Sequence, residues 1–216
     1  MKRVLSLVLC ILVLFACSAC ENVDNNGKDK EVETDGSEII EEVIEPVEVK
    51  EPEKILLPFE DGVEFGLSTG AGGWYTSLIL DNEGGIYGNF HDNEYGEVGE
   101  EYENGTQYWN EYWGFFENIE KVNNYSYKMV LKDMATSQPT DVVEIDEEEK
   151  LRYVTTDKIT GIVEDREYIL YLPNTPVLKL PENIDMSQMN ITADKDVIDC
   201  YILYNVEDEM FFISEL

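Results

Sequence analysis

The residues best suited to chemistry lie in an acidic, glycine-rich segment from His91 to Gly105. Its carboxylates could bind a hard cation such as Ca²⁺, which takes about six to eight oxygen ligands. The candidate metal ligands are Asp92, Glu94 and Glu97. Their spacing does not follow the EF-hand loop, and a solvated acidic loop is the simpler interpretation in a chain that is acidic throughout. The sequence therefore predicts no cofactor, and Ca²⁺ bound at this segment is the alternative.

His91 is the only histidine in the chain, and it could act as a general base beside Asp92 or Glu94. Two carboxylates acting as acid and base are another route to hydrolysis. The sequence offers no nucleophile elbow, no metal-type histidine pair and no phosphate-binding loop. Because the chain has 47 acidic residues, finding two carboxylates that could face each other says little about catalysis. A cell-envelope hydrolase that uses His91 and nearby carboxylates is the alternative function, whereas a partly buried histidine at a strand end is the simpler expectation.

A dense aromatic segment forms a third candidate site, because a strand of period two would carry aromatic rings on both faces. The two faces are Tyr108, Tyr112 and Phe116, and Trp109, Trp113 and Phe115. One face must line the core, while the other either packs under a covering segment or forms a platform for sugars, peptides or apolar ligands. Trp109 and Trp113 would lie about 13 Å apart along the strand. That spacing suits successive sugar rings, with Glu111 accepting hydroxyl hydrogen bonds between them.

Short alternating segments and tight turns must position these residues. Eight strands are predicted, at Trp74–Leu80, Ile86–Phe90, Gln107–Phe116, Tyr125–Leu131, Arg152–Thr156, Glu167–Leu172, Asp199–Tyr204 and Met210–Ser214. Short helices are predicted at Val142–Lys150 and Glu182–Met189. Successive short strands indicate an all-β fold. We expect an antiparallel meander of about eight strands, closed or nearly closed as a barrel, with one or two short helices.

The first 20 residues have the pattern of a secretory signal. Two basic residues precede an apolar run from Val4 to Phe15, which is too short to span about 30 Å of hydrocarbon. The following Ala-Cys pairs resemble a bacterial lipobox, so either Cys17 or Cys20 is predicted to be acylated. Leu14 favours Cys17, whereas the small residues before Cys20 favour that site. Two or three acyl chains would hold the protein on the extracytoplasmic face of the membrane.

The mature chain divides into a tether and one domain. Residues 21–54 hold 13 acidic residues and four lysines, a net charge of −9, without an aromatic residue, which predicts an extended, disordered acidic tether. Residues 55–216 are expected to form a single β-rich domain. Cys200 is expected to be a small buried hydrophobic residue of this domain, and no structural disulfide is predicted. The net charge of −32 disfavours nucleic acid as a partner.

Several motifs, in order along the domain, together resemble an uncharacterised family of surface lipoproteins from Gram-positive bacteria. They are Ser68–Trp74, Leu78–Leu80 with its Gly-rich turn, His91–Glu94 with Gly96, Tyr102–Thr106, Tyr125–Tyr127, Leu170–Pro176 and Leu203–Val206. This resemblance implies no assigned activity. The Gly72-Gly73-Trp74 opening of a strand is also similar to lipocalin-like barrels, in which the tryptophan closes one end.

Taken together, these patterns predict a lipid-anchored, extracytoplasmic binding or interaction module. Its expected partners are the membrane, through the anchor, and a cell-wall sugar, lipid or protein ligand; the domain is expected to be a monomer. The hydrolase and a purely structural envelope lipoprotein are the two alternatives. A binding module predicts an exposed aromatic patch or a barrel cavity, whereas an enzyme predicts His91 and a carboxylate together in a cleft.

Overall fold

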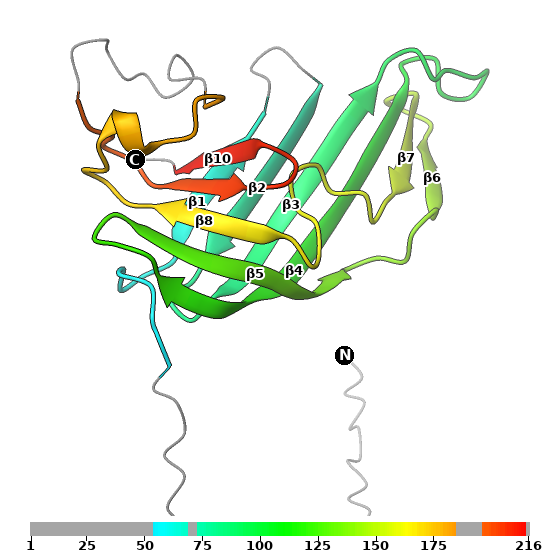
Figure 1. The fold of residues 1–216 in the computed structure, drawn as a ribbon. Coiled ribbons are helices and arrows are strands. Elements are labelled where there is room, and N and C mark those ends of the chain that lie inside the picture. The colour runs from blue at the N-terminus through cyan, green and yellow to red at the C-terminus, as the bar shows by residue number, and fades with distance from the viewer. Residues whose placement is uncertain (1–53, 69–72, 185–195, 215–216) are drawn as a thin grey trace, which may run out of the picture. The chain divides into compact units, whose positions relative to one another are not determined.

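The computed structural model describes residues 54–68, 73–184 and 196–214, all within one compact unit of residues 51–216 (Figure 1). The lipidation candidates Cys17 and Cys20, and all of the predicted tether except Lys54, lie outside the described residues. The described elements are β1 Val63–Leu67, β2 Trp74–Leu80, β3 Gly85–Glu94, β4 Thr106–Lys121, β5 Ser126–Thr136, β6 Val143–Asp146, β7 Leu151–Thr155, β8 Glu167–Tyr171, the 3-10 helix η1 Val177–Lys179, β9 Ile202–Asn205 and β10 Met210–Ser214.

Eight of these strands form a closed barrel. Their order is β3-β2-β1-β10-β9-β8-β5-β4, and β4 pairs back onto β3. Every pairing around the barrel is antiparallel. The predicted antiparallel, all-β barrel is therefore confirmed. One strand of the barrel differs from the prediction. The barrel contains β1, which was not predicted, in place of β7, which was predicted but lies outside the barrel.

Strands β6 and β7 extend the sheet beside the barrel instead of joining it. The ladder between β5 and β4 reaches no further than the pair Tyr112 and Thr136. Over Thr106–Trp109, strand β7 takes that place and pairs with β4 in parallel. Strand β6 then pairs with β7 in antiparallel fashion. Strands β6 and β7 are seen at the side of the barrel in Figure 1. Together with the barrel strands β3 and β4, which they extend, they are here called the wing.

The prediction of a helix at Val142–Lys150 is wrong, because this segment contains β6 and the turn into β7. The acidic residues look helix-compatible, but Val143 and Ile145 are β-branched and alternate with acids, which favours a strand. Asp146 then ends the strand, since its Oδ1 accepts hydrogen bonds from the backbone N–H groups of Glu148 and Glu149 at 2.9 and 2.8 Å. The other predicted helix, Glu182–Met189, is not helical over Glu182–Ile184, and its remainder lies outside the described residues.

Large apolar and aromatic side chains fill the barrel. An eight-stranded barrel has an interior just wide enough for side chains to fill. The largest fully buried ones are Tyr112, Tyr168, Phe65, Phe116, Phe212, Leu78, Leu80, Met129, Leu131 and Leu170. All of them belong to one core cluster. Trp74, which the lipocalin resemblance places at a barrel end, is partly buried and packs against this cluster at the first residue of β2.

A segment that precedes β8, residues 156–166, closes one end of the barrel and is here called the plug. Its Ile159 and Ile162 are buried in the core cluster. Thr76 Oγ1 donates a hydrogen bond to the carbonyl of Thr160 at 2.9 Å, and Tyr168 OH donates to the carbonyl of Gly161 at 2.9 Å. Burial raises the pKa of the Tyr168 phenol, which therefore stays protonated as a donor. The plug is thus part of the folded core.

At the opposite end of the barrel, the chain enters beside the turn between β2 and β3. Leu57 is buried, and its N–H donates to the carbonyl of Asn82 at 2.9 Å. The ring of Phe59 packs edge-on against Tyr201, with 5.7 Å between ring centroids. These contacts seal the end at which the described residues begin.

The outer surface of β8, β9 and β10 is covered by a second apolar cluster. Cys200 is buried there with Ile198, Ile202 and Tyr204, as predicted for a small hydrophobe on that segment. Partly buried residues of the connector between β8 and β9, among them Val177 of η1, pack against the same cluster. The outer face of the wing is the contrasting surface, because its aromatic residues remain partly or largely accessible.

Candidate functional site

The aromatic strand β4 separates core from surface residue by residue. Tyr112 and Phe116 are fully buried inside the barrel, as the even-numbered positions of a strand with period two. Trp109 and Trp113 occupy the opposite face, where Trp113 is 44% exposed. Of the face formed by Tyr108, Tyr112 and Phe116, the last two line the core, whereas Tyr108 is only partly buried and lines another pocket. The predicted platform residues Trp109, Glu111 and Trp113 share the outer face.

The wing shapes a groove on that outer face, with a volume of about 540 Å³. Its outward-facing lining comes from all four strands and is here called the outer groove: Asn89, His91, Gln107, Trp109, Glu111, Glu144, Asp146 and Tyr153. Phe90 and Asn110 also contribute to the lining. This volume falls within the range of about 300–1,000 Å³ typical of small-ligand sites. The groove is thus large enough to hold one or two sugar rings or a compound of similar size.

Strand register explains how two aromatic side chains come to line the same groove. Gln107 of β4 pairs with Tyr153 of β7, and Trp109 pairs with Thr155. Trp109 is therefore displaced by two residues from Tyr153 on a neighbouring strand, which places their Cα atoms about 8 Å apart. Both side chains are partly buried. An indole and a phenol at this distance can offer adjoining flat faces to one ligand.

Polar groups surround the two rings and could fix a ligand's orientation. Asn89 pairs across the ladder with Glu111, and His91 pairs with Trp109. Amide, imidazole and carboxylate groups together supply both donors and acceptors. The Tyr153 hydroxyl donates a hydrogen bond to Glu149 Oε2 at 3.0 Å, which orients the phenol. Apolar faces edged by such groups are the usual composition of a site for hydroxyl-rich ligands.

Three carboxylates line the groove, and nearby carboxylates contribute to raised pKa values of two phenols on this face. Partial burial, the hydrogen bond to Glu149 and the nearby charges of Asp146 and Glu144 raise the pKa of Tyr153. Partial desolvation and the Glu111 carboxylate raise the pKa of Tyr87, which pairs with Trp113 on the same face. Neither lysine nor arginine contributes to the lining of the outer groove.

Trp113 does not line the groove. It lies four residues beyond Trp109 on the same strand, next to Tyr87, which is 47% exposed. The three predicted platform residues are thus arranged in sequence along the face: Trp109 and Glu111 in the groove, and Trp113 on the open surface beyond it.

The candidate metal ligands occupy the other face of the wing. Asp92, Glu94 and Glu97 line a second pocket of about 550 Å³, together with residues of the plug such as Lys158. Within the described ranges, no group of three or more His, Cys, Asp or Glu side chains is arranged to hold a metal ion. Ca²⁺ binding at these residues stays a prediction.

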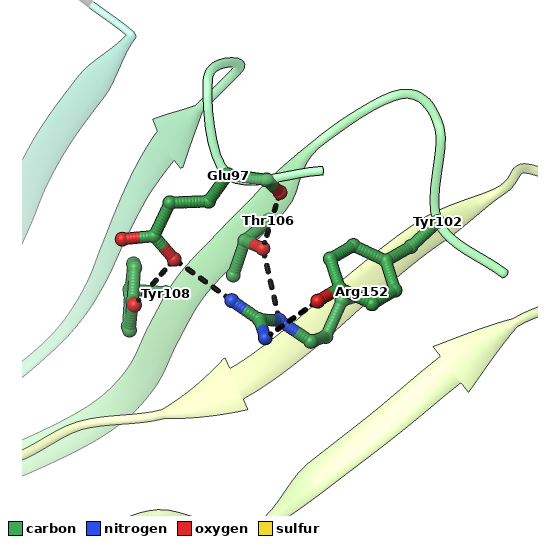
Figure 2. Close-up of polar contacts among 5 residues, drawn as sticks. All are labelled: Glu97, Tyr102, Thr106, Tyr108 and Arg152. Carbon is green, nitrogen blue, oxygen red and sulfur yellow. Dashed lines mark hydrogen bonds and ion pairs between the residues drawn. The ribbon is translucent and has the colours of Figure 1, made fainter. Parts of the chain in front are cut away.

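Glu97 belongs to a hydrogen-bond network around Arg152, shown in Figure 2. The Arg152 guanidinium donates to Glu97 Oε2 at 2.8 Å, to Tyr102 OH at 3.0 Å and to Thr106 Oγ1 at 2.9 Å. It also lies over the Tyr102 ring, 4.5 Å from the centroid. Tyr108 OH donates to the same Glu97 oxygen at 2.8 Å, and this bond, with partial burial, raises the Tyr108 pKa. The network fastens the loop at residues 95–105 to β4 and β7.

Replacing Arg152 with Met should lower the free energy of unfolding by about 1–2 kcal/mol, because three side-chain hydrogen bonds are lost while Glu97 stays partly exposed. Urea unfolding measures the change. Lys128→Met is the matched control, since its 3.4 Å ion pair with Glu120 is exposed and should contribute under about 0.5 kcal/mol. Equal losses in the two variants would show that the network does not fasten the loop.

The structure separates His91 from Asp92. As consecutive residues of β3 they point to opposite faces, so His91 lines the outer groove and Asp92 lines the second pocket. The described contact of the His91 ring is with Tyr75, at 6.1 Å between centroids. The predicted acid–base pairing of these two neighbours is therefore not formed; Glu111, Glu144 and Asp146 are the carboxylates that share the groove with His91.

Sequence reasoning missed most of the groove's other residues. Asn89 and Gln107 follow the period of two that identified Trp109, so extending that pattern along β3 and β4 would have found them. Tyr153, Glu144 and Asp146 carried no such signal, because their position depends on the parallel pairing of β7 with β4 across more than 40 residues of chain.

Among the described residues, none forms a helix long and apolar enough to cross a membrane. No family model matches the chain, and neither curated proteins nor solved structures show a significant similarity to it. The resemblance to Gram-positive surface lipoproteins therefore stays a prediction, and the function has to be argued from the geometry of the groove.

Proposed function

We propose that this protein is a lipid-anchored, extracytoplasmic binding module that captures a glycan in the outer groove. The observation that carries the proposal is that Trp109 of β4 and Tyr153 of β7, two residues apart in register on neighbouring strands, line one groove of about 540 Å³ edged by amides and carboxylates. Flat aromatic faces suit the apolar faces of sugar rings, and the polar edge suits their hydroxyl groups. The signal segment with Cys17 or Cys20 supports an anchor outside the cytoplasm.

The open face beyond the groove supports a chain-like ligand rather than a single sugar. Trp113 and Tyr87 continue the aromatic surface, and Trp113 lies about 13 Å from Trp109 along the strand. A filled barrel supports the outer face as the site, because the core side chains and the plug occupy the interior that a lipocalin-like ligand would need.

Replacing Trp109 with Ala should weaken glycan binding by at least about 10-fold, since buried tryptophan contacts often contribute more than about 1.4 kcal/mol. Isothermal titration of the full-length protein in detergent with soluble cell-wall oligosaccharides measures the effect. Trp113→Ala should leave disaccharide affinity nearly unchanged and weaken only longer oligosaccharides, which reach beyond the groove.

Tyr95→Ala is the matched control, because Tyr95 is 71% exposed in the loop at residues 95–105, outside the groove. It should bind as the native protein does. Undiminished binding by a folded Trp109→Ala variant would refute the outer groove as the glycan site. Thermal unfolding of each variant separates loss of the site from loss of the fold.

A further inference from the structure

The carboxylates of the outer groove have no lysine or arginine side chain beside them in its lining. Three carboxylates line the groove, from Glu111 of β4 and from Glu144 and Asp146 of β6. Of the ion pairs within the described residues, none involves these three side chains. The second pocket differs in having Lys158 in its lining and Glu97 paired with Arg152 at 2.8 Å. Its other carboxylates, Asp92, Glu94, Asp141 and Asp157, enter none of the ion pairs among the described residues.

The carboxylates also stand close to the aromatic faces. Glu144 pairs with Tyr153 across the ladder, and the charges of Asp146 and Glu144 add to the burial and the Glu149 interaction that raise the Tyr153 pKa. Glu111 lies two residues from Trp109 on the same strand face. A cation held over either ring would therefore meet both the negative face of the ring and a nearby carboxylate.

We propose that the groove selects a cationic glycan, an oligosaccharide of amino sugars whose amines are free and protonated, over N-acetylated or anionic glycans. The inference rests on the glycan-binding function proposed above and names the class of glycan. A protonated amine on the sugar ring can pair with Glu111, Glu144 or Asp146 while the ring stacks on Trp109. N-acetylation removes that charge, and a phosphate or carboxylate on the glycan is repelled.

The test compares two ligands that differ only at the amine: a glucosamine hexamer and an N-acetylglucosamine hexamer. Both are titrated into the full-length protein in detergent by calorimetry. The glucosamine hexamer should bind at least about 10-fold more tightly at an ionic strength of about 0.01 M, because three partly exposed pairs each contribute about 2–5-fold. Near about 1 M salt, where the Debye length is about 3 Å, the two affinities should approach each other.

The combined variant Glu111→Gln, Glu144→Gln and Asp146→Asn should bring the ratio of the two affinities close to one. The matched control, Glu100→Gln, Glu101→Gln and Glu103→Gln, removes the same charge from the exposed loop at residues 95–105 and should preserve the ratio. This control separates the groove from the general acidity of the chain.

Each outcome decides one statement. Equal binding of the two hexamers to the native protein would overturn charge selection and leave the glycan-binding function standing. A preference for the glucosamine hexamer that the loop variant also loses would overturn the groove as its origin. Binding of neither hexamer, nor of any other oligosaccharide, would refute the proposed function together with the inference.

Discussion

An Asn205→Asp variant should lose about 3–5 kcal/mol of stability at pH 7, although the two side chains have the same shape. Asn205 is fully buried. Its Nδ2 donates to the carbonyl of Gly161 at 3.2 Å, to Tyr168 OH at 3.1 Å and to Asp208 Oδ2 at 3.0 Å. The substitution places a second carboxylate against two of these acceptors, in a site that joins the plug to β9.

The loss should depend on pH, with a sign that follows from burial. Burial and the Asp208 charge should raise the pKa of the new carboxyl in the folded state above its unfolded value of about 3.9. Stability is then best retained below about pH 4, where the carboxyl is protonated in both states, and falls as the pH rises above that value. Urea unfolding of the native and variant proteins at several pH values measures the difference.

Asn123→Asp is the control for the same chemical change at an exposed turn. Asn123 Oδ1 accepts from the Tyr125 N–H at 2.7 Å, and a carboxylate oxygen can do the same. This variant should lose under about 1 kcal/mol at any pH. A loss at Asn205 that is constant between pH 4 and pH 7 would show that missing hydrogen bonds, rather than the buried charge, account for it.

Replacing Gly88 with Ala should lower the free energy of unfolding by about 3 kcal/mol, because no space exists for a methyl group. Its Cβ would lie 2.1 Å from the carbonyl oxygen of Ser77 and 2.6 Å from the Tyr112 hydroxyl. Tyr112 crosses above Gly88 so that its hydroxyl can donate to that same carbonyl at 2.9 Å. The substitution must therefore displace either the ladder of β2 and β3 or the central ring of the core.

The expected fall in the midpoint of thermal unfolding is about 6–12 °C for a domain of this size. Gly96→Ala is the paired measurement, since a Cβ at Gly96 would have nothing within 4 Å. That variant should be neutral or slightly stabilising. If Gly88→Ala melts at the same temperature as Gly96→Ala, Tyr112 does not occupy the position described.

Local periodicity predicted the strands and one side of the site. The alternation in β4 identified both its core face and its outer face, because the neighbours of each side chain are set by a period of two. Strand β1 was missed, although Val63, Phe65 and Leu67 alternate, because the segment is short and contains Gly66. Strand β7 was predicted, whereas β6 and the turn after it were predicted as a helix because their acidic residues resemble an exposed helix.

The groove itself could not be predicted in the same way. It exists only because β5 leaves β4 near Tyr112 and β7 pairs with the freed edge in parallel. Such a pairing joins segments that are distant in sequence, and neither segment carries a local mark of its partner. Hence Trp109 was recognised from its strand, whereas Tyr153, which completes the aromatic pair, was not.

The entry of the chain beside Asn82 has a mechanical consequence. This turn lies at one end of the barrel, and the β6–β7 hairpin lies toward the other. Tension between the N-terminal segment and a ligand held in the groove would run roughly along the strands. Hydrogen bonds between the eight barrel strands lie across that direction and would be sheared together, because the closed barrel has no edge from which pairs can be peeled one by one. Strand β6 lies outside the barrel and is the edge strand of the wing. The barrel is therefore suited to bear a pulling force between the proposed anchor and the proposed glycan ligand.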